Sequence, residues 1–125
     1  MKRILVIDDD EVVRSTACAV LEAAGYQVFE AGDGVAGLRV HREQSPDLVL
    51  VDLFMPEMDG LEFIRKLRVE CPDAMIVAMS SGGRMGSPDM LAAAAVFGAA
   101  RTLQKPFDPR ALLTALRDVL DEPTP

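Results

Sequence analysis

The sequence has 125 residues, half of them apolar and 26% charged, with a formal net charge of −7. This length fits one domain with a core of its own. The acidic balance argues against nucleic acid and anionic membranes as partners, because both would repel the chain. No apolar run approaches the ~20 residues of a membrane span, and Cys18 and Cys71 lie far apart, so we expect a cytoplasmic protein with reduced thiols.

Apolar runs alternate with segments of helical spacing along the whole chain. The runs at 4–7, 48–51 and 75–79 are continuously apolar, which is typical of strands covered on both faces in a parallel sheet. The segment 26–30 alternates, as an edge strand would, and 99–104 gives the weakest strand prediction. These patterns predict five strands.

The predicted helices have apolar residues three or four positions apart, at 12–24, 35–40, 61–69 and 112–120, and a further helix opens at Ser87-Pro88. The first three of them end at Gly25, at Ser45-Pro46 and at Cys71-Pro72. Strand and helix therefore alternate, which predicts an open parallel sheet with helices on both faces. We expect one domain over 1–121, a short C-terminal tail over 122–125 and no effector domain. In such sheets ligands bind at the carboxyl ends of the strands.

Polar residues stand at four of these strand ends: Asp8-Asp9-Asp10-Glu11, Asp52, Ser80-Ser81 and Lys105. Crowded carboxylates repel one another, so one must take up a proton or a cation must join them. Mg²⁺ prefers oxygen ligands and combines one or two carboxylates with phosphate oxygens. A lysine ammonium suits a phosphate oxygen, and an aspartate carboxylate can be a nucleophile toward phosphorus. The set predicts an aspartyl-phosphate site.

Each of these pieces has an ordinary structural explanation when it is taken alone. Acidic residues favour a helix N-terminus, so the first run could simply open a helix. Asp52 could be a strand-end cap, Ser80 part of a loop, and Lys105-Pro106 a turn. Their arrival at four strand ends of one predicted sheet is what favours a shared site.

The chain resembles the receiver domains of response regulators, the phosphoacceptor half of bacterial two-component signalling. The matching segments are 4–11, 52–60 with the pattern M-P-x-M-D-G, Ser80 and 105–107. The resemblance implies an α/β, flavodoxin-like doubly wound (βα)5 fold with a five-stranded parallel sheet in the order 2-1-3-4-5. It also implies a phosphoacceptor, which assists its own phosphorylation and dephosphorylation, rather than an enzyme.

The same resemblance implies a Mg²⁺ site. Asp9 and Asp52 would ligate the ion together with the backbone carbonyl of Phe54, and Asp8 would act mainly through a bound water. Because Asp10 and Glu11 extend the acidic run, the acid nearest the metal stays open by one position.

The resemblance further implies the phosphoryl donor and the switch. Asp52 would be the phosphorylation site and take the group from a phosphohistidine of a sensor histidine kinase. Ser80 would be the switch hydroxyl, and Lys105 would contact the phosphate from a peptide bond to Pro106 that the family often holds cis. The output would be a downstream target protein or a histidine phosphotransfer protein.

Two departures from the family pattern bear on the output. Thr102 stands where receivers usually carry Tyr or Phe, and the loop 82–88 is about three residues longer than expected. Thr102 keeps an alternative open, a pseudo-receiver that binds partners without phosphorylation. Phe54 offers no polar group to orient an attacking water, so we expect a long-lived aspartyl phosphate.

Two rivals with other chemistry are disfavoured. A haloacid-dehalogenase-like phosphatase carries a second Asp two residues after its nucleophile, where this chain has Phe54. A flavin-binding protein of the same topology needs a phosphate-binding loop after the first strand, where acidic residues stand here and would repel a phosphate.

Overall fold

A computed structural model describes residues 1–55, 58–81, 92, 94–96, 98–105 and 107–120. The strands are β1 (Arg3–Ile7), β2 (Gln27–Ala31), β3 (Leu48–Asp52), β4 (Ile76–Ser81) and β5 (Arg101–Lys105). The helices are α1 (Glu11–Ala23), α2 (Gly34–Gln44), α3 (Gly60–Glu70) and α5 (Pro109–Leu120). The helix start predicted at Ser87-Pro88, the loop 82–88, the tail 122–125 and the cis bond at Pro106 lie outside the described residues, whereas residues 92 and 94–96 of the predicted helix are helical.

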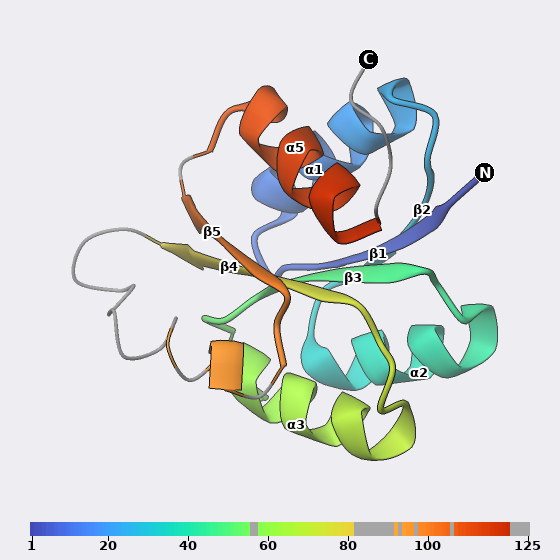
Figure 1. The fold of residues 1–125 in the computed structure, drawn as a ribbon, viewed down its shortest axis with the longest axis vertical. Coiled ribbons are helices and arrows are strands. Elements are labelled where there is room, and N and C mark those ends of the chain that lie inside the picture. Colours follow the sequence, from blue (N-terminus) through green and yellow to red (C-terminus); the bar gives the residue numbers. More distant parts are fainter. Residues whose placement is uncertain (56–57, 82–91, 93, 97, 106, 121–125) are drawn as a thin grey trace.

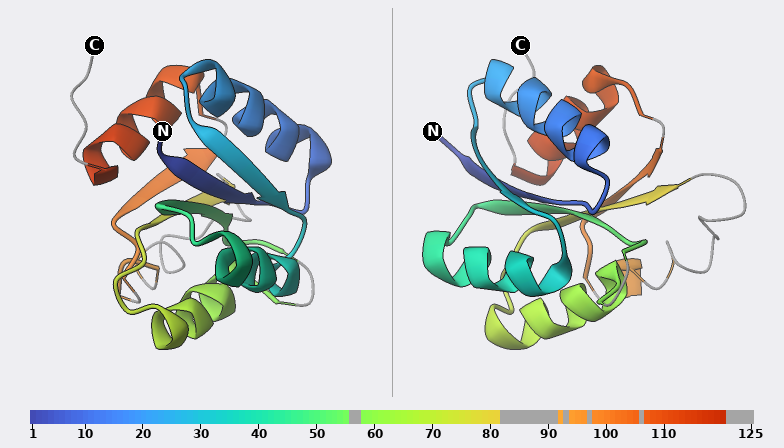
Figure 2. Two further views of the ribbon diagram at one scale, coloured as in Figure 1. Left: turned by 90° about the vertical axis from the view of Figure 1, so that its right-hand side faces the viewer. Right: turned by 180° about the vertical axis from the view of Figure 1, so that it is seen from behind.

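The strands form one parallel sheet in the order β2-β1-β3-β4-β5. Helices α1 and α5 cover one face of the sheet, and α2 and α3 cover the other (Figures 1 and 2). This confirms the predicted flavodoxin-like doubly wound fold and its strand order. The carboxyl ends of all five strands consequently point to one edge of the sheet.

Burial explains which strands were easy to predict. All five residues of the central strand β3 are buried, which requires the continuous apolar run seen in the sequence. The outer strands β2 and β5 expose part of their residues, so their sequences are mixed. In β5 the side chains of Arg101, Thr102 and Gln104 are exposed, which accounts for the weak prediction there.

The sheet separates two apolar cores. One lies against α2 and α3 and contains Phe63, Val49 and Val51. The other lies against α1 and α5 and contains Leu48 and Leu50. Successive side chains of β3 thus enter opposite cores, as the period of a strand requires. Full burial of such a side chain contributes about 1.5–3 kcal/mol, so β3 is held from both faces.

Aspartates cap the N-termini of α1, α2, α3 and α5. The carboxylate of Asp10 accepts from the amides of residues 12 and 13, and Asp33 and Asp59 cap α2 and α3 in the same way. Asp108 accepts from the amide of Ala111 in α5 at 2.7 Å. An aspartate cap satisfies amides that have no partner within the helix. Some of the acidic residues of the chain therefore stabilise helix N-termini.

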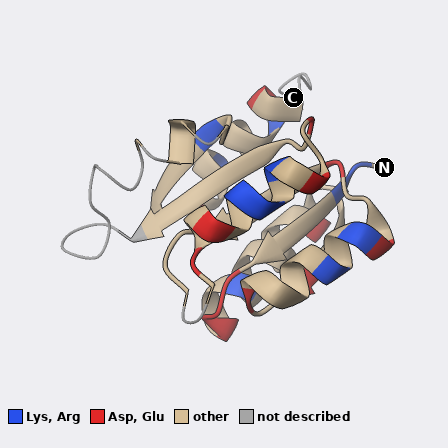
Figure 3. Cartoon of the chain, turned by 90° about the horizontal axis from the view of Figure 1, so that it is seen from below, with Lys and Arg blue, Asp and Glu red and all other residues tan. Residues whose placement is uncertain are grey.

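Charge is spread over the surface. Lys and Arg are interspersed with Asp and Glu along the helices, and further acidic residues lie on the loops (Figure 3). Within the described part of the chain, every helix is too short or too polar to cross a bilayer.

Candidate functional site

Asp8 follows β1 and is completely buried. Its amide donates to the carbonyl of Ala31 at 3.2 Å, and its own carbonyl accepts from Nη1 of Arg14 at 2.7 Å. The Oδ1 atom accepts from the amide of Asp10 at 2.9 Å. A buried carboxylate needs such partners, because leaving its polar atoms unsatisfied would cost stability. The position of Asp8 is thereby fixed through both its backbone and its side chain.

Asp9 and Asp10 have different environments. The carboxylate of Asp10 is bonded to the first amides of α1, at 3.0 and 3.2 Å. Asp9 is exposed, and carboxylate oxygens of Asp8, Asp9 and Asp52 lie within 4.8 Å of one another. The structure thus assigns Asp10 to the helix and groups Asp9 with Asp8 and Asp52.

Asp52 ends β3 with only 3% of its surface exposed. Its Oδ1 accepts from the amide of Phe54 at 3.3 Å. Burial is the main reason that the pKa of Asp52 is raised to about 6, and the nearby charge of Asp8 adds to it. The ammonium of Lys105 and the Phe54 amide act in the opposite direction. At neutral pH without a cation, the ionised carboxylate of Asp52 is poorly solvated, so binding of a cation beside it is favourable.

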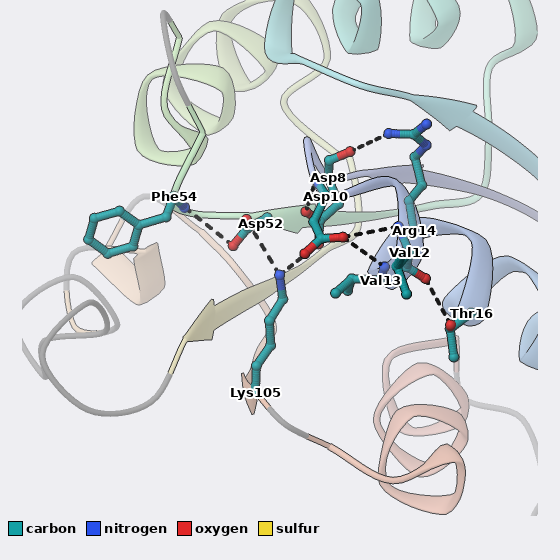
Figure 4. A network of polar contacts seen from close by, with 9 residues as sticks. All are labelled: Asp8, Asp10, Val12, Val13, Arg14, Thr16, Asp52, Phe54 and Lys105. Carbon is teal, nitrogen blue, oxygen red and sulfur yellow. Dashed lines mark hydrogen bonds and ion pairs between the residues drawn. The ribbon is translucent and has the colours of Figure 1, made fainter.

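Lys105 ends β5 and reaches both buried acids (Figure 4). Its Nζ lies 2.7 Å from Oδ2 of Asp8 and 3.5 Å from Oδ2 of Asp52. The lysine side chain is 15% exposed, so this pair is shielded from solvent and held in one geometry. An ammonium at this point can bond to an oxygen of a group attached to Asp52.

The remaining predicted residues lie on β4, on β5 and directly after β3. Ser80 is fully buried in β4, one residue beyond Met79, which pairs with Asp52 across the sheet. Phe54 is half-buried directly after the end of β3. Thr102 is exposed on β5 and pairs with Ala78, so it lies two residues before the level of Ser80. Their predicted roles as switch, ligand and readout position stay predictions.

Sequence reasoning missed the contribution of Arg14. From α1 its guanidinium donates to the carbonyl of Asp8 and, through Nε, to Oε1 of Glu30 on β2 at 3.1 Å. It links the loop after β1 to the edge strand. Nothing in the local sequence pairs Arg14 with Glu30, since the contact exists only once α1 has packed on β2.

The acidic group fits a divalent metal. Three carboxylates from two neighbouring strand ends offer oxygen atoms within 4.8 Å of one another. This is the donor type that Mg²⁺ takes in proteins, and the exposed Asp9 leaves one side open for water or a phosphate oxygen. A cation would also relieve the repulsion between Asp8 and Asp52.

Comparison with known proteins agrees with this geometry. The family model of the response regulator receiver domain matches residues 4–117. Chemotaxis protein CheY of Thermotoga maritima is 34% identical over 94% of this chain and 97% of its own length. Sporulation initiation phosphotransferase F of Bacillus subtilis is 33% identical over 86% of this chain and 84% of its own length.

Longer proteins and solved structures match as well. Response regulator MprA of Mycobacterium sp. is 37% identical over 98% of this chain, which spans 52% of that protein. The chemotaxis protein CheY4 of Vibrio cholerae superposes with a TM-score of 0.88 at 30% identity, covering 95% of this chain and 98% of that one. The chain belongs to the family of response regulator receiver domains.

Proposed function

We propose that this chain is a phosphoacceptor of a two-component phosphorelay, in which Asp52 takes a phosphoryl group in the presence of Mg²⁺. The observation that carries the proposal is the arrangement around Asp52. Two further carboxylates lie within 4.8 Å, and the Lys105 ammonium stands between Asp8 and Asp52 at 2.7 and 3.5 Å. An acidic trio with one fixed ammonium suits a phosphoryl group and a divalent cation together.

The proposed reaction is a displacement at phosphorus. A carboxylate oxygen of Asp52 forms the new P–O bond, while the P–N bond to the donor's imidazole breaks. The electron pair of that bond stays on the imidazole nitrogen. Asp9, Asp52 and the Phe54 carbonyl would hold Mg²⁺, which would supply positive charge to offset the charge on the phosphoryl oxygens. Lys105 supplies a second positive charge beside Asp8 and Asp52.

The residues of the chain prepare this step in three ways. The Phe54 amide holds one carboxylate oxygen of Asp52 by a 3.3 Å bond, which orients the side chain. Burial keeps competing water away from the carboxylate. The raised pKa also makes Asp52 a better nucleophile once ionised, since its negative charge is poorly stabilised by the protein alone.

The output follows from the new charge at Asp52. Phosphorylation replaces one carboxylate charge with a group of about two negative charges, which draws Lys105 away from Asp8 and engages Ser80. The protein then changes which partner surface it presents. We assign it a sensor histidine kinase as donor, a target or histidine phosphotransfer protein as acceptor, a cytoplasmic location and no catalytic turnover of its own.

Thr102 favours one alternative, a pseudo-receiver that binds its partner without phosphorylation. The side chain at this position is exposed and small, so an aromatic readout of Ser80 through it is absent. The metal-fitting trio and the ordered Lys105 weigh against this alternative, because a binding module needs neither.

Intact mass spectrometry tests the proposal. The protein is incubated with Mg²⁺ and acetyl phosphate, and we expect the mass of one phosphoryl group to appear on the wild type and to be lost in Asp52→Asn. The same incubation with EDTA in place of Mg²⁺ should leave the mass unchanged. A wild type that gains no mass, or an Asp52→Asn variant that still does, contradicts the proposal.

A further inference from the structure

The chain leaves β3 at Asp52 and returns to the same place at the start of α3. The amide of Gly60, the first residue of α3, donates to the carbonyl of Leu53 at 3.0 Å. Gly60 is buried against the backbone there. This bond ties the start of α3 to the residue between the phosphoacceptor Asp52 and Phe54.

The closure leaves no room for a side chain at Gly60. A Cβ atom built on this residue would overlap the carbonyl oxygen of Asp52 and lie 2.6 Å from Cα of Leu53 and 3.0 Å from the carbonyl carbon of Asp52. All of these are backbone atoms, which cannot turn aside as the end of a side chain can. A substitution here must therefore move the start of α3 or the Asp52–Leu53 backbone.

The backbone on which Gly60 rests also sets the geometry of the site. Leu53 is fully buried, and its amide donates to the carbonyl of Met79 at 2.9 Å, so this peptide is already held by β4. The next amide, that of Phe54, is the one that orients the Asp52 carboxylate. A displacement of one ångström at a site of this kind is enough to cost about a hundredfold in rate.

We propose that Gly60 is a positioning residue of the phosphorylation site, in that its missing side chain lets the start of α3 lie against the Asp52–Leu53 backbone, which positions the Asp52 carboxylate and the Phe54 amide. The inference rests on the proposed function for its effect on phosphorylation. Its effect on metal binding depends only on the placement of the Asp52 carboxylate and the Phe54 peptide.

Gly34 provides a matched control. It is also a buried glycine at the first position of a helix and also follows an aspartate cap. A Cβ there would meet the side chain of Met58, with 2.6 Å to Sδ and 2.9 Å to Cγ. Met58 belongs to the same loop as Phe54, yet its thioether can rotate away without moving the backbone. The methyl group of Gly34→Ala thus contacts a side chain, whereas the methyl group of Gly60→Ala contacts backbone atoms.

The experiment compares wild type, Gly60→Ala and Gly34→Ala at a temperature at which thermal melting shows all three folded. Mg²⁺ affinity is measured by calorimetry and by the amide shifts of residues 52–54 in NMR spectra, and phosphorylation by acetyl phosphate is followed by intact mass. For Gly60→Ala we expect Mg²⁺ affinity to fall roughly tenfold, the usual size of the loss when a ligand's support is removed, and phosphorylation to slow at saturating Mg²⁺. Gly34→Ala should keep the wild-type affinity.

Equal Mg²⁺ affinity of Gly60→Ala and wild type, or an equal loss in Gly34→Ala, overturns the inference. If the wild type takes up no phosphate, the proposed function fails, while the Mg²⁺ titration still decides the role of Gly60.

If Gly60→Ala does not fold, two variants of the preceding residue answer the same question. Asp59→Ala removes the cap of α3, whose Oδ1 accepts from the amide of Glu62 at 2.8 Å, whereas Asp59→Asn keeps a capping side chain. Both remove one charge, so only loosening of the helix start separates them. We expect weaker Mg²⁺ binding in Asp59→Ala than in Asp59→Asn, and equal affinities contradict the inference.

Discussion

Lys105 bonds to Asp8 more closely than to Asp52, although Asp52 is the residue that carries the proposed chemistry. The Nζ atom lies 2.7 Å from Asp8 and 3.5 Å from Asp52, and Asp8 is 97 residues away in the sequence. The lysine charge is therefore shared. Burial raises the pKa of Asp52 by more than this shared ammonium lowers it.

The raised pKa predicts how stability depends on pH in EDTA. Because the folded-state pKa of Asp52, about 6, lies above that of an unfolded chain, the folded protein binds the extra proton and is favoured at low pH. This contribution is lost as pH rises through about 6. The wild type should thus lose on the order of 2 kcal/mol relative to Asp52→Asn between pH 4 and pH 7.5. Urea unfolding of both proteins across this range measures the difference, and a constant difference contradicts the prediction.

The same titration governs metal binding. A protonated Asp52 offers a weaker ligand, so Mg²⁺ affinity should fall below about pH 6 and reach a plateau above it. Calorimetric titrations at several pH values test this. An affinity that stays flat from pH 5 to pH 8 would exclude Asp52 as a ligand with this pKa.

Removing the lysine charge should destabilise the protein when no metal is present. Lys105→Met leaves the buried Asp8 carboxylate without its ion pair, and we expect a loss of about 3 kcal/mol in the free energy of unfolding. Saturating Mg²⁺ should restore part of it, since the ion replaces the missing charge. Lys66→Met serves as control, because its pair with Glu62 is exposed and 3.6 Å long, and such pairs contribute less than about 1 kcal/mol. Similar losses in both variants would contradict the assigned role.

The different roles of Asp9 in the carboxylate trio and of Asp10 as the cap of α1 can be tested with charge-matched variants. Asp9→Asn and Asp10→Asn each remove one negative charge, and Asn preserves the cap of α1. Only Asp9→Asn removes a member of the carboxylate trio. We expect roughly tenfold or greater loss of Mg²⁺ affinity in Asp9→Asn and a much smaller change in Asp10→Asn. Asp10→Ala should instead lower the free energy of unfolding by about 1 kcal/mol.

The apolar side chain of Phe54 leads us to expect slow hydrolysis of the aspartyl phosphate in the phosphorylated protein. Its half-buried ring follows Asp52 by two residues and has no group that could orient a water for attack on phosphorus. Phe54→Asn should shorten the half-life of the phosphorylated protein, followed by intact mass after the phosphodonor is removed. Phe54→Leu, which is also apolar, should keep it. A wild-type half-life of seconds that Phe54→Asn leaves unchanged contradicts the idea.

Most of the fold could be predicted from the sequence because the sheet is parallel and covered on both faces. Short continuous apolar runs such as Leu48–Val51 are typical of strands that are buried on both faces, and their order along the chain leaves few topologies. The strand boundaries shifted by at most two residues, and the largest shifts are at β4 and β5. In β5, exposed side chains blur the apolar pattern.

The site could be predicted only in part. The converging strand ends follow from topology, so Asp8, Asp52 and Lys105 were expected to meet, and the structure brings them together. The sequence could not tell which acid of the first run opens α1, because capping depends on where the helix begins. Nor could it tell that Arg14 supports Asp8, since that contact needs the packed helix.

The central strand also limits what phosphorylation can move. Leu48 and Leu50 of β3 belong to one core and Val49 and Val51 to the other, so any sliding of the strand would disturb both at once. The backbone of Asp52 therefore keeps its position, and the conformational response to its phosphorylation must come from the elements around β3. The amides of β3 should exchange with solvent only through global unfolding, in both the free and the phosphorylated protein.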